Sequence, residues 1–206
     1  MRNKKNGWIF YVHNISVIIP LAPNEQSHHQ LLDDLKDTGF EIITLSEGTR
    51  AKSLNKGAEI AKHNSLWFLH ADSRVSKNNL DALNQAIKQT ANTISTLHYF
   101  NLTYRQGGVA SLNAIGANLR SCILGLPYGD QGFCMSKDTF KTIGNYPDAP
   151  YGEDVLFIRK AKRNGVKLNR IASKLSTCAR KYHDIGWLKL TVIRQIQILK
   201  LIRQKI

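Results

Sequence analysis

Three short apolar runs, each followed by a helical pattern, constrain the fold of this chain most. Residues 15–19 form a largely β-branched run that ends at Pro20, as expected of a buried strand. Residues 41–45 and 66–69 repeat this pattern, and the segments between the runs place apolar residues at helical spacing. Strands that alternate with helices build a parallel sheet with helices on both faces. The sequence therefore predicts an α/β domain.

Two of the expected helices carry start signals. Ser27 and Gln30 fit a capping box, and Ser76 is placed to cap a helix that begins after it. A further helix is expected over residues 50–62, where the inward positions are leucine and alanine. The first half of the chain thus predicts three helices between strands.

The second half of the chain is less regular. Strands are expected over residues 93–104 and 133–135, with two more short strands near Leu168 and Leu175. Helices are expected around residues 112–122 and 153–164, and from about residue 186 to the end.

The length of 206 residues suits one domain with its own core. We divide the chain into an N-terminal extension (1–14), a domain (15–185) and a basic amphipathic C-terminal helix (186–206) packed on or extending from that domain. The three cysteines form no Cys-x-x-Cys pair, so we expect buried free thiols in a reducing compartment. No segment approaches the roughly 20 apolar residues of a membrane-spanning helix, and we expect a cytoplasmic protein.

The net charge of +14 is concentrated at the C-terminal end. From Arg159 onward the chain has 14 Lys or Arg residues and one acid, which favours an anionic partner. No nucleic-acid-reading motif is present, so no nucleic-acid partner is expected. Two interpretations of residues 187–206 remain: a helix that lies on the inner face of an anionic membrane, or one that packs on its own domain.

Asp72 is the first residue with the position and chemistry of a binding site. It follows the third strand, at the edge of a parallel sheet where ligands bind. His70 is two residues earlier, so on extended backbone both side chains point the same way. Asp72 suits Mg²⁺ or Mn²⁺ with water and a diphosphate as the other ligands, although it equally suits a cap of the following turn.

Three further clusters combine polar and charged residues in loops. Asp130 and Gln131 lie between two glycines, which is also typical of an ordinary turn. Glu153 and Asp154 begin a helix, where acids are favourable whatever their role and where a general base reaches a cleft. The basic run 180–183 suits a diphosphate, or it forms a solvated turn.

Taken in order, these segments resemble the family 2 glycosyltransferases of the GT-A fold. The sequence is most similar to the bacterial branch described as radical-SAM/selenodomain-associated transferases. Each motif is short, and their order and spacing over nearly the whole chain carry the resemblance. The matching segments are residues 16–20 with Asn24 and Glu25, residues 50–58, residues 69–72, residues 129–131, and Glu153 and Asp154 with Arg159.

The resemblance implies a GT-A-like, Rossmann-like fold with a mixed, mostly parallel sheet. It implies an inverting, metal-dependent glycosyltransferase of the hexosyltransferase type that uses a nucleotide-sugar donor, Mg²⁺ or Mn²⁺, and an acceptor, with a lipid-linked one as a candidate. The metal would bind Asp72 and His70, and Asp154 would be the catalytic base beside Glu153. The donor would contact Pro20, Glu25, Glu47, Arg50, Asn55, Asp130, Gln131, Arg180 and Lys181.

One departure from the family concerns the donor site. Family members usually have an acidic turn after the second strand and then a further helix and strand. Here residues 41–48 lead almost at once to Arg50, so a shortening by one strand–helix unit is expected, with Glu47 as the substitute acid. The alternative function is a degenerate, non-catalytic GT-A domain that acts as a binding module.

Overall fold

A six-stranded sheet forms the centre of the computed structural model, which describes residues 14–90, 95–105 and 109–178. The strands are β1 (Ile15–Pro20), β2 (Glu41–Leu45), β3 (Ser65–Phe68), β4 (Thr96–Tyr104), β5 (Phe133–Ser136) and β6 (Lys167–Thr177). The helices are α1 (His28–Leu35), α2 (Arg50–Ile60), α3 (Lys77–Thr90), α4 (Val109–Leu124), α5 (Lys137–Ile143) and α6 (Glu153–Arg163). A short 3-10 helix, η1 (Gly129–Gln131), precedes β5.

The strands lie in the order β2-β1-β3-β5-β4-β6. β1 pairs in parallel with β2 and β3, and β4 pairs in parallel with β6. β5 is antiparallel to both β3 and β4, so the other five strands point the same way. This confirms the predicted α/β fold with a mixed, mostly parallel sheet. Residues 46–49 alone join β2 to α2, which agrees with the expected shortening of the first half.

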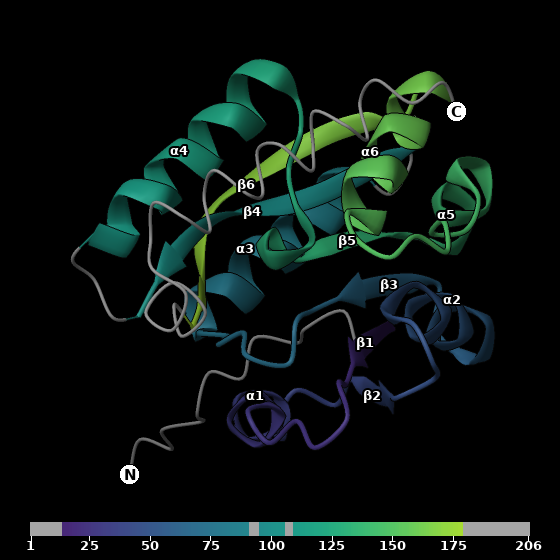
Figure 1. The fold of residues 1–206 in the computed structure, drawn as a ribbon, viewed down its shortest axis with the longest axis vertical. Helices are drawn as coiled ribbons and strands as arrows, with labels where there is room; N and C mark the ends of the chain where they lie inside the picture. Colours follow the sequence, from purple (N-terminus) through teal and green to yellow (C-terminus); the bar gives the residue numbers. More distant parts are fainter. Residues whose placement is uncertain (1–13, 91–94, 106–108, 179–206) are drawn as a thin grey trace, which may run out of the picture.

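Helices cover both faces of the sheet (Figure 1). On one face, Leu54 of α2 and Phe157 of α6 pack in one core with Phe68 of β3. On the other face, Leu83 of α3 packs in a second core with Trp67. Adjacent strand residues point to opposite faces, so Trp67 and Phe68 supply the two cores in turn. This two-sided burial explains why the central strands are continuous apolar runs.

The last strand differs from the prediction of two short strands. β6 runs unbroken over 11 residues beside β4. Phe100 pairs with Ile171 and the next residue, Asn101, pairs with Lys174, so β6 carries extra residues at this bulge. A bulge interrupts the alternation of apolar and polar residues, which is why the sequence pattern indicated two segments.

The two predicted capping signals have different outcomes. The Ser27 side chain makes no capping hydrogen bond, and its backbone N–H instead donates to Glu25 Oε1 at 3.0 Å, so that prediction is wrong. Ser76 Oγ accepts from the backbone N–H of Asn79 at 3.3 Å, and Asn79 Oδ1 accepts from that of Ser76 at 2.9 Å. The cap at Ser76 is therefore confirmed.

Several predictions lie outside the described residues. These concern the N-terminal extension, the C-terminal helix, and the residues Arg180 and Lys181. Within the described ranges, no helix has the length and apolar character needed to cross a membrane. Cys134 is buried, as predicted, but Cys122 is exposed and Cys178 is half-buried.

His98 is a buried titratable group on β4, between β5 and the edge strand β6. Its side chain is 3% exposed, and Nδ1 lies 3.0 Å from Asn169 Nδ2 while Nε2 lies 3.0 Å from Thr90 Oγ1. An amide N–H directed at Nδ1 fits a neutral ring that carries its proton on Nε2. Burial lowers the pKa of His98 from its ordinary value of 6.5 to about 4. The folded state thus excludes a proton that the unfolded chain binds.

Acid is expected to destabilise the fold through His98. A depressed pKa contributes stability that is complete above pH 6.5 and is lost as the pH falls toward 4, a loss on the order of 3 kcal/mol. His98→Gln, which has no titrating group, should reduce this pH dependence in urea unfolding measured from pH 7 to 4. The matched control is His29→Gln at an exposed position. A pH dependence identical in wild type and His98→Gln would contradict the assignment.

Candidate active site

Four segments meet at the edge of the sheet where the parallel strands end. α2 begins at Arg50 shortly after β2, and His70 follows β3. η1 leads into β5, which runs against the other strands, so the start of β5 lies at this same edge. α6 begins with Glu153 and Asp154. This is the edge where open α/β sheets bind their ligands.

Arg50 joins three of these segments. Its Nη1 forms an ion pair with Glu153 Oε1 at 3.0 Å, and its Nη2 contacts His70 Nε2. The Arg50 side chain is 37% exposed, whereas that of Glu153 is 9% exposed. The guanidinium therefore compensates a buried carboxylate on one side and remains open to solvent on the other.

Gly129 lets the cluster close. Its backbone N–H donates to Asp154 Oδ2 at 2.7 Å. A Cβ added at Gly129 would lie 2.9 Å from Arg50 Nη2 and 3.0 Å from His70 Nε2, closer than the usual contact between such atoms. The absence of a side chain at Gly129 is thus what allows Arg50, His70 and Asp154 to approach one another.

The two adjacent acids of α6 have different surroundings. Glu153 is buried, and burial raises its pKa, with Asp154 adding to the rise and Arg50 opposing it. Asp154 is half-buried, and its Oδ1 accepts from the backbone N–H of Val155 at 2.8 Å. Glu153 is therefore the partner of Arg50, while Asp154 is the more accessible carboxylate. Its two backbone hydrogen bonds fix the direction in which it points.

A small cavity lies within this cluster. It has a volume of about 10 Å³, close to what one water molecule needs. Arg50, His70, Gly129, Asp154 and Tyr146 line part of it. Leu54, Phe68, Leu69 and Phe133 complete the lining. Apolar residues in the lining keep water away from Arg50, His70 and Asp154, which strengthens their electrostatic interactions.

Tyr146 is a cavity residue that the sequence did not single out. Its ring stacks on Phe157 at 4.0 Å between centroids, and burial raises its pKa well above the ordinary value. The Asn55 side chain holds the backbone of Tyr146 through two hydrogen bonds, one of 2.9 Å to its carbonyl oxygen and one of 2.8 Å from its N–H. The one sequence signal is that Tyr146 lies just before Pro147, in the loop that leads to α6.

Asp72 lies in the loop after β3, on the side of the cluster toward β6. It is half-buried, and its Oδ1 accepts a hydrogen bond of 3.1 Å from Thr177 Oγ1 at the end of β6. Thr177 was not singled out from the sequence, because its relation to Asp72 depends on the pairing of β4 with β6. The carboxylate is thus oriented by a buried hydroxyl.

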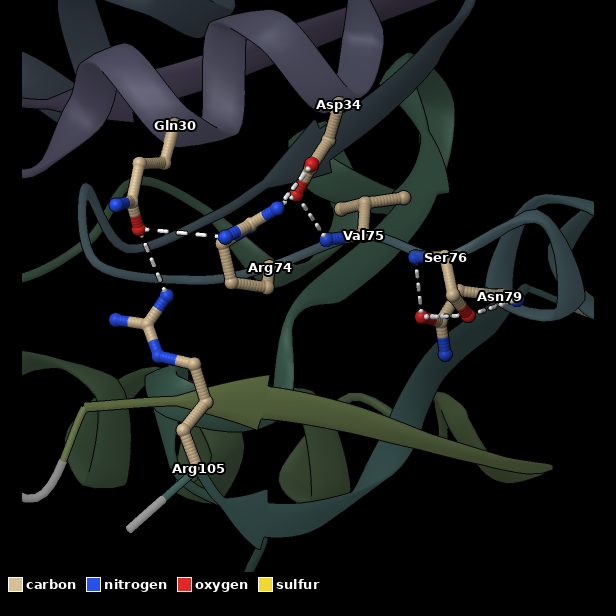
Figure 2. Close-up of polar contacts among 7 residues, drawn as sticks. All are labelled: Gln30, Asp34, Arg74, Val75, Ser76, Asn79 and Arg105. Carbon is tan, nitrogen blue, oxygen red and sulfur yellow. Dashed lines mark hydrogen bonds and ion pairs between the residues drawn. The ribbon is translucent and has the colours of Figure 1, made fainter.

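The loop that carries Asp72 is anchored two residues later (Figure 2). Arg74 binds Asp34 of α1 with two hydrogen bonds of 2.7 and 2.8 Å, and Asp34 also accepts from the backbone N–H of Val75. Gln30 Oε1 accepts from Arg74 at 3.3 Å and from Arg105 at 3.2 Å. Bidentate arginine–carboxylate pairs fix geometry as well as charge. The position of Asp72 therefore depends on α1 and β6 together.

The remaining predicted donor residues take different places. Gln131 is fully buried, and its amide binds Ser121 Oγ and the carbonyl oxygen of Phe100, so it holds η1 against α4 and β4. Asn55 holds the backbone of Tyr146. The structure therefore gives both amides structural contacts. The others are Pro20, buried at the end of β1, Glu25 in the following loop, Glu47, exposed before α2, and Asp130, half-buried in η1.

The predicted metal site rests on Asp72 alone in this arrangement. His70 Nε2 faces the Arg50 guanidinium, and a cation at that nitrogen opposes a metal ion there. Among the described residues, no group of three or more His, Cys, Asp or Glu side chains is placed to hold a metal. Asp72 still suits Mg²⁺ or Mn²⁺ as a single carboxylate ligand, with the other ligands from water and a diphosphate.

Comparison with known proteins gives a structural likeness only. No protein-family model matches the chain, and no curated protein matches it in sequence. Among solved structures, it is similar to "S. aureus TarS 1-349" with a TM-score of 0.60 and 14% identity over 80% of this chain. It is also similar to a longer S. aureus TarS structure, with a TM-score of 0.55 and 14% identity over 81% of this chain.

The chain spans 60% of the first of these structures and 37% of the second. At this identity the likeness concerns the fold. It agrees with the strand order and helix layers described above, and together they show that the chain has a GT-A-like fold.

Proposed function

We propose that the protein is an inverting glycosyltransferase that moves a sugar from a nucleotide-sugar donor to an acceptor hydroxyl. The observation that carries the proposal is the cluster of Arg50, Asp154 and Gly129 at the carboxyl edge of a GT-A-like sheet. One of the similar structures is that of S. aureus TarS, whose fold this chain shares. A cluster with a cation and an oriented carboxylate beside a small cavity suits this reaction.

The proposed reaction needs a base on one side of the sugar and positive charge on the other. The acceptor oxygen forms a bond to the anomeric carbon as the bond to the donor phosphate breaks. Asp154 takes the proton from the acceptor hydroxyl, and the diphosphate leaves with the bonding electron pair. Attack from the face opposite the leaving group inverts the anomeric centre. The accessible position and fixed orientation of Asp154 suit this role.

Glu153 has a different role in this proposal. It is buried and paired with Arg50, so it sets the position of the guanidinium rather than exchanging a proton with the acceptor. Arg50 remains partly exposed on the cavity side, where its charge stabilises the negative charge that develops on the diphosphate. Glu153 is thus a positioning residue, and Arg50 is the donor-binding cation.

The donor site also includes the loop around Asp72. A Mg²⁺ or Mn²⁺ ion held by the Asp72 carboxylate would neutralise the leaving diphosphate. Arg180 and Lys181, which lie outside the described residues, add positive charge to this proposal. Glu25 and Glu47 follow β1 and β2 at the edge where the nucleotide would lie. Asp130 borders the proposed sugar position from η1.

A non-catalytic binding module is the second candidate. Two observations favour it. Asp154 accepts a backbone hydrogen bond on each carboxylate oxygen, which makes it a weaker base, and the cavity beside it is small. Such a module binds a nucleotide without breaking the sugar–phosphate bond. Both candidates therefore bind a nucleotide, but only the glycosyltransferase breaks the sugar–phosphate bond of the donor.

A nucleotide-sugar panel tests the proposal. The full chain is incubated with uridine, guanosine, cytidine, adenosine and thymidine diphosphate sugars, each with Mn²⁺ or Mg²⁺ and with water as the surrogate acceptor. Release of a nucleoside diphosphate above background from at least one donor, with inversion at the released sugar, is expected. Binding of a donor without release of the nucleoside diphosphate indicates the binding module. If no donor is bound and none is cleaved, both candidates are contradicted.

A further inference from the structure

The outer face of α4 carries large apolar side chains from Leu112 to Leu124. Among the described residues, six large apolar side chains are strongly exposed, and five of them belong to this helix. Leu112, Ile115, Leu119 and Ile123 are 58%, 62%, 57% and 68% exposed, and their spacing of three and four residues places them on one stripe. Leu124, which is 55% exposed, extends it. We call these five residues the α4 stripe.

The inner face of α4 has the opposite character. Ala114 and Ala117 are buried against Leu102 and Tyr104 of β4. Asn118 binds both the N–H and the carbonyl oxygen of Leu102, at 2.7 and 3.0 Å. The helix thus places small and polar residues against the sheet and large apolar residues outward. These inner contacts fix which side of α4 faces the sheet, and they leave the stripe on the opposite side.

The surface beside the α4 stripe is cationic. Residues 160–178, which form the end of α6 and β6, contain six Lys or Arg residues and no acid, and α4 contains no acid either. Lys162 Nζ donates to the carbonyl oxygen of Leu124 at 2.9 Å, which places one of these cations at the end of the stripe. β6 lies next to β4, which α4 covers (Figure 1).

We propose that the α4 stripe docks on an anionic lipid bilayer. Apolar side chains enter the boundary between headgroups and acyl chains, while neighbouring lysines and arginines bind anionic headgroups. A second copy of the chain fits less well, because a two-fold contact through the stripe brings two acid-free cationic surfaces together. The proposal does not depend on the reaction that the site catalyses.

Vesicle flotation with the full chain tests this proposal. The protein should float with vesicles of phosphatidylglycerol and phosphatidylcholine, and much less with phosphatidylcholine alone. The double variant Ile115→Ser/Leu119→Ser should lose at least tenfold in partitioning. Ile60→Ser is the matched control, since Ile60 is 46% exposed on α2, and it should partition as wild type does.

Other results would overturn the proposal. Unchanged flotation of the double variant means that another surface binds the lipid. Equal flotation with both vesicle types would show that the lysines and arginines do not contribute to lipid binding, which contradicts the proposed anionic surface. A wild-type dimer in lipid-free solution that the double variant converts to monomer assigns the stripe to a second copy. Circular dichroism checks folding, and the single variant Ile123→Ser replaces the double variant if the latter does not fold.

Discussion

Asparagine in place of Asp154 is expected to lower nucleotide-sugar turnover by about 10²- to 10⁴-fold, the usual contribution of a general base. The amide keeps a hydrogen-bond acceptor for the N–H of Gly129 but cannot take a proton from the acceptor. Binding of the donor should change little, because the side chain keeps its size and its acceptor for Gly129, and only the hydrogen bond from the N–H of Val155 is lost. The measurement is steady-state release of nucleoside diphosphate from the donor that the panel identifies.

Asp138→Asn is the matched control for this substitution. Asp138 lies on the surface in α5, where its carboxylate is 85% exposed and 4.0 Å from Lys141. Turnover by the Asp138→Asn variant should equal that of wild type. If Asp154→Asn retains wild-type turnover, Asp154 is not the base, whatever its position in the cavity.

Methionine in place of Arg50 should destabilise the fold and weaken donor binding together. It leaves Glu153 buried without its ion-pair partner, and loss of one partner of a buried pair is strongly destabilising. Because Arg50 is partly exposed, we expect about 1–3 kcal/mol, less than for a fully buried pair. Urea unfolding at pH 5 and pH 8 measures the change.

The pH dependence of this loss has a definite sign. Burial raises the pKa of Glu153, and removal of Arg50 raises that pKa further. A raised pKa contributes stability at low pH that is lost as the pH rises through the folded-state value, so the stability that Arg50→Met loses relative to wild type should be larger at pH 8 than at pH 5. The double variant Arg50→Met/Glu153→Gln should recover part of the loss. Lys56→Met, in an exposed pair with Glu59 on the same helix, should show neither effect.

A loss that is equal at both pH values, or a double variant no more stable than Arg50→Met, would contradict the coupling. Either result would mean that Arg50 stabilises α2 through its contact with His70 rather than through Glu153.

The central strands and the start of α2 are features that the sequence predicts well. Continuous apolar runs reveal strands buried on both faces, since each residue of the run has a core to enter. β6 is harder to predict, because its bulge breaks the alternation of apolar and polar residues on which a strand prediction depends. Which face of α4 is exposed is harder still to predict from the sequence. Its apolar spacing predicts a helix but does not tell which side faces the sheet.

The site shows a similar division. The sequence makes Asp72, Glu153 and Asp154 candidates because each is an acid at the end or start of an element. Tyr146 is missed because its place in the cavity depends on the fold of a loop and on Asn55. Gln131 lies where its motif indicates, yet its amide binds backbone and Ser121 rather than facing the cavity. Sequence order thus predicts which segments meet, and packing decides which side chains face a ligand.

Thermal unfolding with nucleoside diphosphates tests the central claim most directly, because it needs neither the sugar nor the acceptor. At about 100 times the Kd, a ligand adds about 2.7 kcal/mol of stability, which for a chain of this size is a rise in Tm of roughly 5–10 °C. We expect this rise with at least one nucleoside diphosphate in the presence of Mn²⁺ or Mg²⁺, and its loss in Asp72→Ala. No rise with any of the five nucleoside diphosphates, with or without metal, would contradict a nucleotide-sugar site at this edge of the sheet.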